Sequence, residues 1–264
     1  MRVHTTSTLQ SLIHRRGEMS PVAIVFIILG VLFVVGTLLI GILLVLLLPA
    51  AQGARTAARR TQSKNNLRIV GLAAHNFHSV NGNFPPGDEN PPESIMPRHS
   101  WTTRLLPYME QNSLYQQIDF SQSWNAPANK SVFTTSLPSM LNPNLTKTTT
   151  DDGYAAGHYA GNIHLFPIGS AVEIREITDG TSNTLMIGEV GMGLAAWGDY
   201  LNIRDPMQGI GSGGSQFGGI PGQQGCQFVL ADGSVRLISE DIDRSVLEAL
   251  ATPAGGEAIQ PGGF

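Results

Sequence analysis

The sequence predicts an α+β protein in which a long N-terminal helix packs on an antiparallel β-sheet. Helical periodicity occupies roughly the first third of the chain, and short apolar runs separated by turn residues follow it. Helix-then-strand order is typical of α+β rather than parallel α/β folds. Charged residues make up only 14% of the chain, while 30 glycines and 16 prolines favour a turn-rich domain over a helical bundle.

The N-terminal helix contains an apolar run long enough to cross a membrane. Residues 22–48 carry no charge, and a helix of that length reaches about 40 Å, against a hydrocarbon core of about 30 Å. The apolar region of a signal peptide is shorter, about 7–15 residues, although Pro49-Ala50-Ala51 resembles a cleavage site. We therefore expect a retained transmembrane helix, with a cleaved signal peptide and a buried core helix as the alternatives.

The helix is expected to continue past the apolar run and past Pro49. Residues 50–80 are rich in Ala, Arg, Gln and Leu, which favour helix, and Asn81-Gly82 supplies a stop signal. An apolar face recurs at spacings of three, four and three, formed by Leu67, Val70, Ala74 and Phe77. The predicted organisation is a polar tail at 1–21, a transmembrane helix at 22–48, an amphipathic extension at 49–82 and a globular β-rich domain at 83–264.

The globular part is expected to contain short elements joined by turns. A helix broken at Pro107 is predicted within residues 100–117, and a closing helix at residues 242–250. Asp232-Gly233 between two apolar runs is a strong hairpin signal. The predicted strands are residues 158–162, 171–173, 184–189, 227–230 and 234–238.

Charge limits the expected partners. The net charge of −4 argues against a general nucleic-acid binder, whose affinity depends on clustered Lys and Arg. The basic residues do cluster, but directly after the apolar run, where a membrane surface is the nearer partner. They are Arg55, Arg59, Arg60, Lys64 and Arg68. Before the run lie Arg2, Arg15 and Arg16, offset by Glu18. Counting Lys and Arg alone therefore places the C-terminal domain in the cytoplasm.

The sequence assigns no residue a catalytic, cofactor-binding or metal-binding role. His75 and His78 lie three apart on the predicted helix, but no nearby carboxylate or cysteine completes a metal site, so packing is expected. His158 and His164 lack ligand spacing. Three acidic turns suit either turn formation or a hard cation such as Ca²⁺, and we expect turn formation. These turns are Asp151-Asp152-Gly153, Asp179-Gly180 and Asp232-Gly233.

The remaining candidate groups also have ordinary interpretations. Cys226 is the only cysteine, which excludes an internal disulfide, and no adjacent histidine activates it, so an inert thiol is expected. No phosphate loop or dinucleotide fingerprint is present. Gly30, Thr37 and Gly41 place small residues along one side of the apolar helix, a weak signal for helix pairing. The serines that lack the G-x-S-x-G context of a nucleophile are Ser182, Ser215 and Ser234.

A series of motifs resembles one known family. They include Leu47-Leu48-Pro49-Ala50, Lys64-Asn65-Asn66-Leu67, His75-Asn76-Phe77-His78, Tyr159-Ala160-Gly161-Asn162, Asp179-Gly180-Thr181-Ser182-Asn183, Asp232-Gly233-Ser234 and Gly255-Gly256-Glu257. In order and spacing the chain is similar to bacterial prepilin-like proteins, catalogued as a domain of unknown function and known for a C-terminal H-x9-DG motif. The resemblance implies a pilin-like build, with an N-terminal helix in the inner membrane and its extension packed on an antiparallel sheet outside the cytoplasm. This placement conflicts with the count of Lys and Arg.

The chain departs from that family at three places. Typical members have a prepilin leader with Phe after Gly and Glu at the fifth mature position, where this chain has Glu18 after Gly17 and then Val22. We therefore expect no processing by a prepilin peptidase. The signature histidine would stand at position 222, which is Gly222. Cysteines common in the family are replaced by Ser63 and Asn142.

The expected function is that of a non-enzymatic structural or interaction protein of the bacterial envelope, similar to the prepilin-type proteins of type II secretion. Its expected partners are the inner-membrane bilayer, which it spans once, and other pilin-like or envelope proteins, with no cofactor. The alternative is a tethered solute- or glycan-binding module that uses Trp101, Trp124, Trp197 and the glycine-rich loop at 209–225. Exposed tryptophans around a pocket would favour binding, and a filled core between helix and sheet would favour a scaffold. No acid–base pair or nucleophile set indicates an enzyme.

Overall fold

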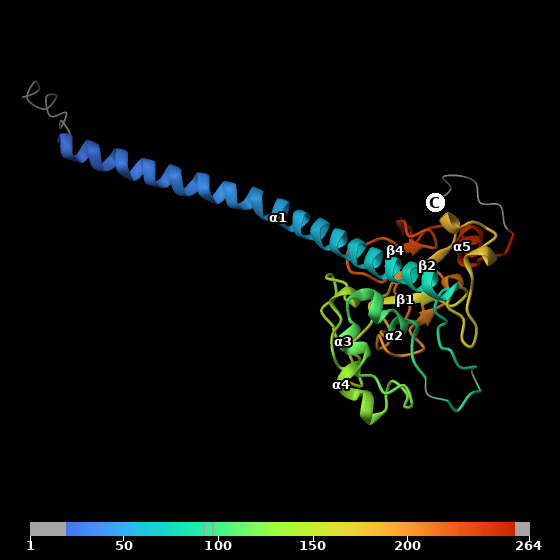
Figure 1. The fold of residues 1–264 in the computed structure, drawn as a ribbon. Helices are drawn as coiled ribbons and strands as arrows, with labels where there is room; N and C mark the ends of the chain where they lie inside the picture. Colours follow the sequence, from blue (N-terminus) through green and yellow to red (C-terminus); the bar gives the residue numbers. More distant parts are fainter. Residues whose placement is uncertain (1–19, 92, 97, 257–264) are drawn as a thin grey trace, which may run out of the picture. The chain divides into compact units, whose positions relative to one another are not determined.

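The computed structural model describes residues 20–91, 93–96 and 98–256, without the side chains of 44 and 46–50. Gly17, Glu18, most of the predicted polar tail and Glu257 lie outside the described residues. The chain divides into two compact units, Met1–Arg55 and Thr56–Phe264. Helix α1 (Pro21–Asn81) begins in the first unit and ends in the second (Figure 1).

In the first unit, α1 presents apolar side chains on all sides. The stretch Pro21–Leu43 is long and apolar enough to cross a membrane, and none of it is buried. A helix that is apolar all round needs an apolar environment. The helix also continues through Pro49, as expected, because the residues that follow are strong helix formers. It ends at Asn81, where Gly82 takes a positive φ of 81° that favours glycine.

A five-stranded mixed sheet forms the centre of the second unit, with strand order β3-β1-β2-β4-β5. The strands are β1 (Tyr159–Asn162), β2 (Leu185–Glu189), β3 (Ile203–Arg204), β4 (Cys226–Leu230) and β5 (Val235–Ile238). Three of the four pairings are antiparallel, as the sequence predicted. The exception is β3, which pairs parallel with β1. The two-residue length of β3 explains why no periodicity revealed it.

The predicted strand at residues 171–173 is wrong. These residues lead into the 3₁₀ turn η4 (Ile174–Glu176), and the main-chain carbonyl of Val172 accepts the N–H of Phe84 at 2.9 Å. Its backbone is therefore satisfied by the segment that follows α1 rather than by a sheet partner. The other four predicted strands correspond to β1, β2, β4 and β5, and Asp232-Gly233 joins the last two as the hairpin turn.

Two apolar layers cover the two faces of the sheet. On one face Leu67, Val70 and Ala74 of α1 are fully buried in a core that includes Val229 of β4, which confirms the predicted apolar face of the helix. On the other face Phe228 of β4 packs with residues of the closing helix α5 (Arg244–Ala251) and the glycine-rich loop. Because both faces are covered, β1, β2 and β4 are buried along their whole length.

Short helices and turns complete the second unit (Figure 1). Helix α2 (Trp101–Leu105) is followed by the 3₁₀ helix η1 (Leu106–Met109), in which Pro107 occupies the first turn. Proline lacks the N–H that would continue α2, so the predicted break is confirmed. The other short helices are α3 (Asn112–Tyr115), η2 (Pro127–Asn129), α4 (Lys130–Phe133), η3 (Pro138–Met140), η5 (Thr181–Asn183) and η6 (Pro206–Gln208).

Candidate functional site: a buried carboxylate cluster

A fully buried carboxylate lies between α1 and the sheet. Glu189 ends β2 and is 0% exposed. Its oxygens accept hydrogen bonds from the Ser63 hydroxyl, the Asn142 side chain at 2.8 Å, the Gln223 side chain at 2.5 Å, and the Gln227 main chain and side chain at 3.0 and 3.2 Å. In the described part of the chain Glu189 forms no ion pair. We call these five residues the Glu189 cluster.

The Glu189 cluster joins segments that are distant in sequence. Ser63 belongs to α1, Asn142 to the loop after η3, Gln223 to the glycine-rich loop and Gln227 to β4. Burying a charge is costly unless hydrogen bonds compensate for lost water, and five donors supply that compensation here. The cluster therefore acts as a polar link that holds α1 against the sheet.

Tyr159 extends the cluster on the sheet side. Its hydroxyl lies 2.9 Å from Ser63 Oγ, and burial raises the pKa of the Tyr159 phenol above its usual range, so the hydroxyl stays protonated. Ser63 donates to Glu189, so its hydroxyl is left as an acceptor for Tyr159. The side-chain oxygen of Gln223 is buried without a partner. Within the described residues no imidazole hydrogen-bonds to Ser63, and its hydroxyl is occupied by these structural bonds.

Two of the positions at which the chain departs from the prepilin-like pattern meet at this carboxylate. Ser63 and Asn142, at which the resemblance had implied cysteines, both bond the same oxygen of Glu189. Gly222, another of these positions, lies on the adjacent glycine-rich loop, and its carbonyl accepts a hydrogen bond from Arg60 of α1. An open hollow of about 550 Å³ lies beside Arg60, Gly222 and Gln223.

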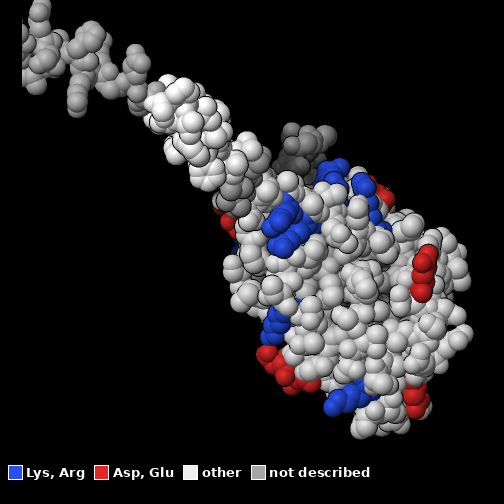
Figure 2. Space-filling view, turned by 90° about the vertical axis from the view of Figure 1, so that its left-hand side faces the viewer, with Lys and Arg blue, Asp and Glu red and all other residues white. Residues whose placement is uncertain are grey.

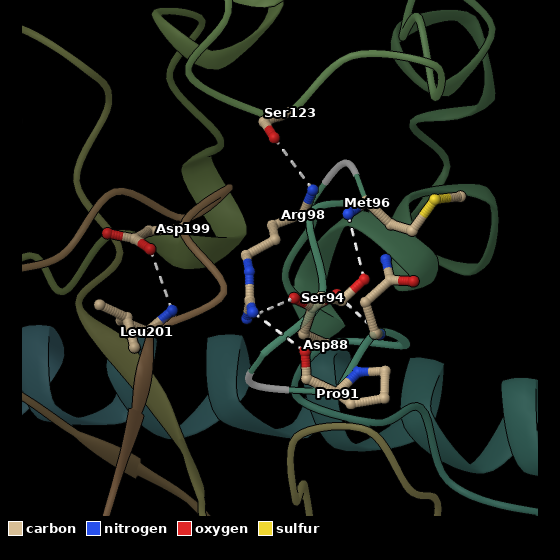
Figure 3. A network of polar contacts seen from close by, with 9 residues as sticks. Asp88, Pro91, Ser94, Met96, Arg98, Ser123, Asp199 and Leu201 are labelled. Atoms are coloured by element: carbon tan, nitrogen blue, oxygen red, sulfur yellow. Dashed lines mark hydrogen bonds and ion pairs between the residues drawn. The ribbon is translucent and has the colours of Figure 1, made fainter.

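A second polar network secures the loop before α2 (Figure 3). Arg98 donates to the buried Asp88 carboxylate at 3.1 Å and to the Pro91 carbonyl at 3.0 Å, and its guanidinium lies 4.5 Å from the ring centre of Tyr200. Nearby, Asp199 accepts the N–H of Leu201 at 3.0 Å. Burial raises the pKa of both Asp88 and Asp199. The contacts hold the loop before α2 together and, through Tyr200, attach it to the segment that contains Asp199, so this network also stabilises the fold.

Arg204 organises the glycine-rich loop. Its guanidinium donates to four main-chain carbonyls at 2.6 to 2.8 Å, those of Met192, Gly193, Gly214 and Gln216. Burial lowers the pKa of Arg204, but arginine remains charged at physiological pH. Arg204 therefore ties the glycine-rich loop to residues 192 and 193, and Phe217 of the same loop is buried against Phe228 of the sheet.

The three tryptophans belong to the core. Trp101 and Trp197 are 0% exposed and Trp124 is 9% exposed. The indole N–H groups of Trp101 and Trp197 donate to the carbonyls of Asn202 and Thr135 at 2.8 and 2.9 Å. These side chains offer no platform for a sugar, so the feature on which the binding-module alternative rested is a packing feature.

The histidines singled out in the sequence do not come together as a metal site. His75 and His78 pack on Phe84, with ring centres 5.5 and 5.1 Å away. His158 is buried and bonds the N–H of Asn142 and the carbonyl of Lys147, at 2.9 and 2.8 Å, whereas His164 lies 3.1 Å from Asp205. Among the described residues no group of three or more His, Cys, Asp or Glu could hold a metal ion.

The acidic turns and the cysteine have structural contacts. Asp232 accepts the N–H of Ser234 at 2.8 Å, as expected of a turn residue. The Asp179 main-chain carbonyl accepts the side-chain amide of Asn183 at 3.1 Å within the turn, whereas the Asp179 carboxylate accepts the N–H groups of Gly255 and Gly256 at 2.7 and 3.0 Å and so secures the segment after α5. Asp151 pairs with Lys147. Cys226 is fully buried, and burial raises the pKa of its thiol, which agrees with an inert role.

Gly233→Val is expected to destabilise the protein by about 1–3 kcal/mol, because Gly233 has a φ of 81° that valine rarely adopts. Asp232→Asn should cost less than about 0.5 kcal/mol, since an amide oxygen can still accept the Ser234 N–H. Thermal unfolding of the two variants measures both costs, and repeating it with calcium or EDTA tests whether a bound ion contributes to stability. A calcium-dependent rise in the melting temperature that Asp232→Asn abolishes would contradict the structural role.

Acidification is expected to lower stability through buried imidazoles. Burial lowers the pKa of His75 and His158, and lowers the pKa of His99 to about 4. The unfolded chain, with a histidine pKa of about 6.5, then binds protons more readily. The contribution of His99 is full above about pH 6.5 and is lost as the pH falls towards 4. Protonation of Asp88 and Asp199, whose pKa values are raised, acts in the opposite direction.

Melting temperatures measured between about pH 7 and pH 4 check this expectation. His99→Gln should flatten the slope, because glutamine does not titrate. An unchanged slope in that variant would show that His99 is not responsible.

Fold and site together define a class: an α+β protein in which an apolar helix continues into a segment that packs on a sheet around a buried carboxylate. The model of one family, described as a protein of unknown function (DUF1559), matches residues 52–216. This is more than half of the chain, and the protein belongs to that family. The matched range ends before Asp232-Gly233. No curated protein and no solved structure matches the chain. The expected membership in a family of unknown function is confirmed.

Proposed function

We propose that this protein is a non-enzymatic, pilin-like structural or interaction protein, anchored once in the inner membrane of a bacterial envelope. The observation that carries the proposal is α1 itself. One helix supplies an unburied apolar stretch at Pro21–Leu43 and, further along, the buried face at Leu67, Val70 and Ala74. A helix that is both anchor and core element suits a protein that holds its folded part at a membrane.

The interior of the second unit supports a scaffold rather than an enzyme. The Glu189 cluster, Arg204 and the Arg98 network direct their polar groups at other parts of the chain. A catalytic carboxylate or hydroxyl needs access to a substrate, whereas Glu189 and Ser63 are both 0% exposed. We place the folded part outside the cytoplasm, as the resemblance implies.

Membrane retention tests the proposal. The full chain expressed in a bacterium should stay in the membrane fraction at alkaline carbonate pH. Leu32→Arg should weaken insertion by about 3 kcal/mol, because a charge at the centre of a spanning helix costs about 2.5–3.5 kcal/mol. Leu32 is 62% exposed, so the substitution leaves the folded core intact. Release of the unmodified protein by carbonate would refute the anchor.

Protease protection and crosslinking test the remaining parts. In intact spheroplasts, an added protease should digest the folded part if it lies outside the cytoplasm. Crosslinking should then recover envelope proteins or further copies of the chain. Protection of the folded part would instead agree with the count of Lys and Arg and refute the proposed orientation.

A further inference from the structure

Strand β5 forms one edge of the sheet, and its outer side has no strand partner in the described part of the chain. The N–H of Leu230 donates to the carbonyl of Ser234 at 2.8 Å across the hairpin. Bonded and non-bonded pairs alternate along an antiparallel ladder, so Leu237 directs its N–H and carbonyl away from β4. No described residue bonds these two groups, and Leu237 is 55% exposed. The edge therefore offers main-chain groups to an added strand.

Two open hollows lie between α1 and the hairpin of β4 and β5. One of about 550 Å³ is lined by Arg60 and Leu237, and one of about 420 Å³ by Arg68 and Gly233. From Arg60 to Arg68 the helix rises about 12 Å, and from Leu237 back to Gly233 the chain covers about 13 Å. Helix and edge strand therefore run side by side in opposite directions. We call the strip between them, with its two hollows, the α1–β5 groove.

Three cations stand along the helix side of this groove. Lys64 lies four residues from Arg60 and from Arg68, so all three share one side of α1. Arg60 and Arg68 are exposed and Lys64 is half-buried, and none of them forms an ion pair with a described residue. The face of the folded unit in Figure 2 shows few charged side chains among wide uncharged areas. Three neighbouring cations are therefore a local concentration of charge.

Two carboxylates lie beside the groove and compensate this charge only in part. Asp232 lines the hollow at the Arg68 end, where it accepts a main-chain N–H of its own turn at 2.8 Å. Glu189 lies behind the other hollow, but it is 0% exposed and its oxygens are taken by five donors. The accessible charge is therefore three cations against one carboxylate. It is most positive at Arg60 and Lys64, away from Asp232.

An extended acidic segment of another protein fits both the edge and the charge. Side chains on one face of a strand recur about every 6.7 Å, and residues four apart on a helix recur about every 6 Å. Acidic residues at alternate positions of an added strand therefore come opposite successive cations of α1. A second copy of this chain fits less well. Antiparallel pairing of β5 with its own copy places the same side of both α1 segments face to face, so the cations repel one another.

We propose that the α1–β5 groove binds an extended acidic segment of a partner protein, which adds to the sheet beside β5 and places carboxylates near Arg60 and Lys64. The inference rests on the interaction role proposed above and gives it a partner class. It is independent of the membrane anchor, because every residue that carries it belongs to the second unit.

A synthetic peptide of alternating glutamate and threonine tests the inference. The dye-labelled peptide is titrated with the full chain in an uncharged detergent, and fluorescence polarisation measures the dissociation constant. At low salt the peptide should bind about tenfold more tightly than one of alternating lysine and threonine, and high salt should reduce this difference. The glutamate peptide methylated at alternate main-chain nitrogens should lose binding, because it cannot pair with β5.

Matched variants identify the cations. Arg60→Gln with Lys64→Gln should weaken binding of the glutamate peptide about three- to tenfold, and Arg68→Gln should weaken it less. The control, Arg175→Gln with Arg244→Gln, makes the same change in charge as the first pair, at arginines whose side chains are 80% and 78% exposed.

Leu237→Pro tests the strand edge. Proline removes an N–H that no described residue accepts, and edge strands tolerate proline, whereas Leu237→Thr keeps the N–H. The proline variant should lose peptide binding and the threonine variant should keep it, with chemical unfolding as the check that both fold. If proline disturbs the fold, hydrogen exchange of the Leu237 N–H in the unmodified protein decides the question, and bound peptide should slow it about tenfold or more.

Three outcomes would overturn the inference: no binding of the glutamate peptide, binding that survives methylation of its main chain, or an equal loss in the charge control. In the first case the cations only keep the edge from pairing with other strands. Carbonate extraction tests the anchor separately. Crosslinking that recovers envelope proteins while the peptide does not bind refutes the groove and leaves the proposed function standing.

Discussion

Glu189→Ala is expected to lower the free energy of unfolding by about 3–5 kcal/mol. The substitution removes one fully buried carboxylate and leaves its five donor groups, on Ser63, Asn142, Gln223 and Gln227, without their acceptor. Each buried donor without a partner costs about 1–3 kcal/mol, and the cost is partly relieved by relaxation of the surroundings or by an entering water. Because Ser63 lies on α1, the loss should also loosen the helix from the sheet.

Chemical unfolding of the full chain in detergent, followed by near-ultraviolet circular dichroism of the buried tryptophans, measures this loss. Glu173→Ala is the matched control, since Glu173 lies in a surface pair with Arg175 and should cost less than about 1 kcal/mol. Hydrogen exchange in residues 60–75 should rise in the Glu189 variant. Equal stability of the two variants would mean that the cluster does not hold α1.

Gly188→Val is expected to destabilise the protein by about 3 kcal/mol or more through the opposite face of the same strand. A Cβ at Gly188 would lie 2.3 Å from Phe228 and 2.7 Å from Phe217, distances that real side chains do not show. Both rings are 0% exposed and contact each other with centres 4.9 Å apart, so neither can move into free space. Overpacking a filled core typically costs about 1–3 kcal/mol, and a branched side chain between two confined rings exceeds that range.

Gly214→Val is the control for Gly188→Val. A Cβ at Gly214 meets no atom within 4 Å, so the same change in composition should leave stability nearly unaltered. The same unfolding measurement applies to both variants. If Gly188→Val unfolds at the same denaturant concentration as Gly214→Val, the layer between the sheet and α5 is not closely packed, contrary to the structure.

The same strand therefore serves two layers by alternation. The side chain of Glu189 faces α1, and Gly188 faces the rings of Phe217 and Phe228 on the other side of the sheet. A register shift between Leu185 and Ile187 lies near the start of this strand, and beyond it the alternation brings a charged residue to the helix side. Residues 185–188 form an apolar run that is followed directly by the carboxylate of Glu189. A carboxylate at the end of a buried strand is the sequence signal that points to Glu189.

The sequence by itself determined the local elements. The uncharged run at 22–48, the apolar spacing of Leu67, Val70 and Ala74, and the stop at Asn81-Gly82 predicted α1 correctly. Asp232-Gly233 predicted the last hairpin. These features depend on helix periodicity and turn chemistry within a few residues, which a sequence displays directly.

The tertiary structure alone decided the site and the edges of the sheet. Ser63 and Glu189 are 126 residues apart, and Arg60 and Gly222 are 162 apart, so no local pattern brings them together. The parallel edge strand β3 and the capture of Gly255 and Gly256 by Asp179 likewise depend on distant segments. The physical reason is that a buried polar group must find its partners among whichever segments the fold brings around it, and periodicity carries no information about which segments those are.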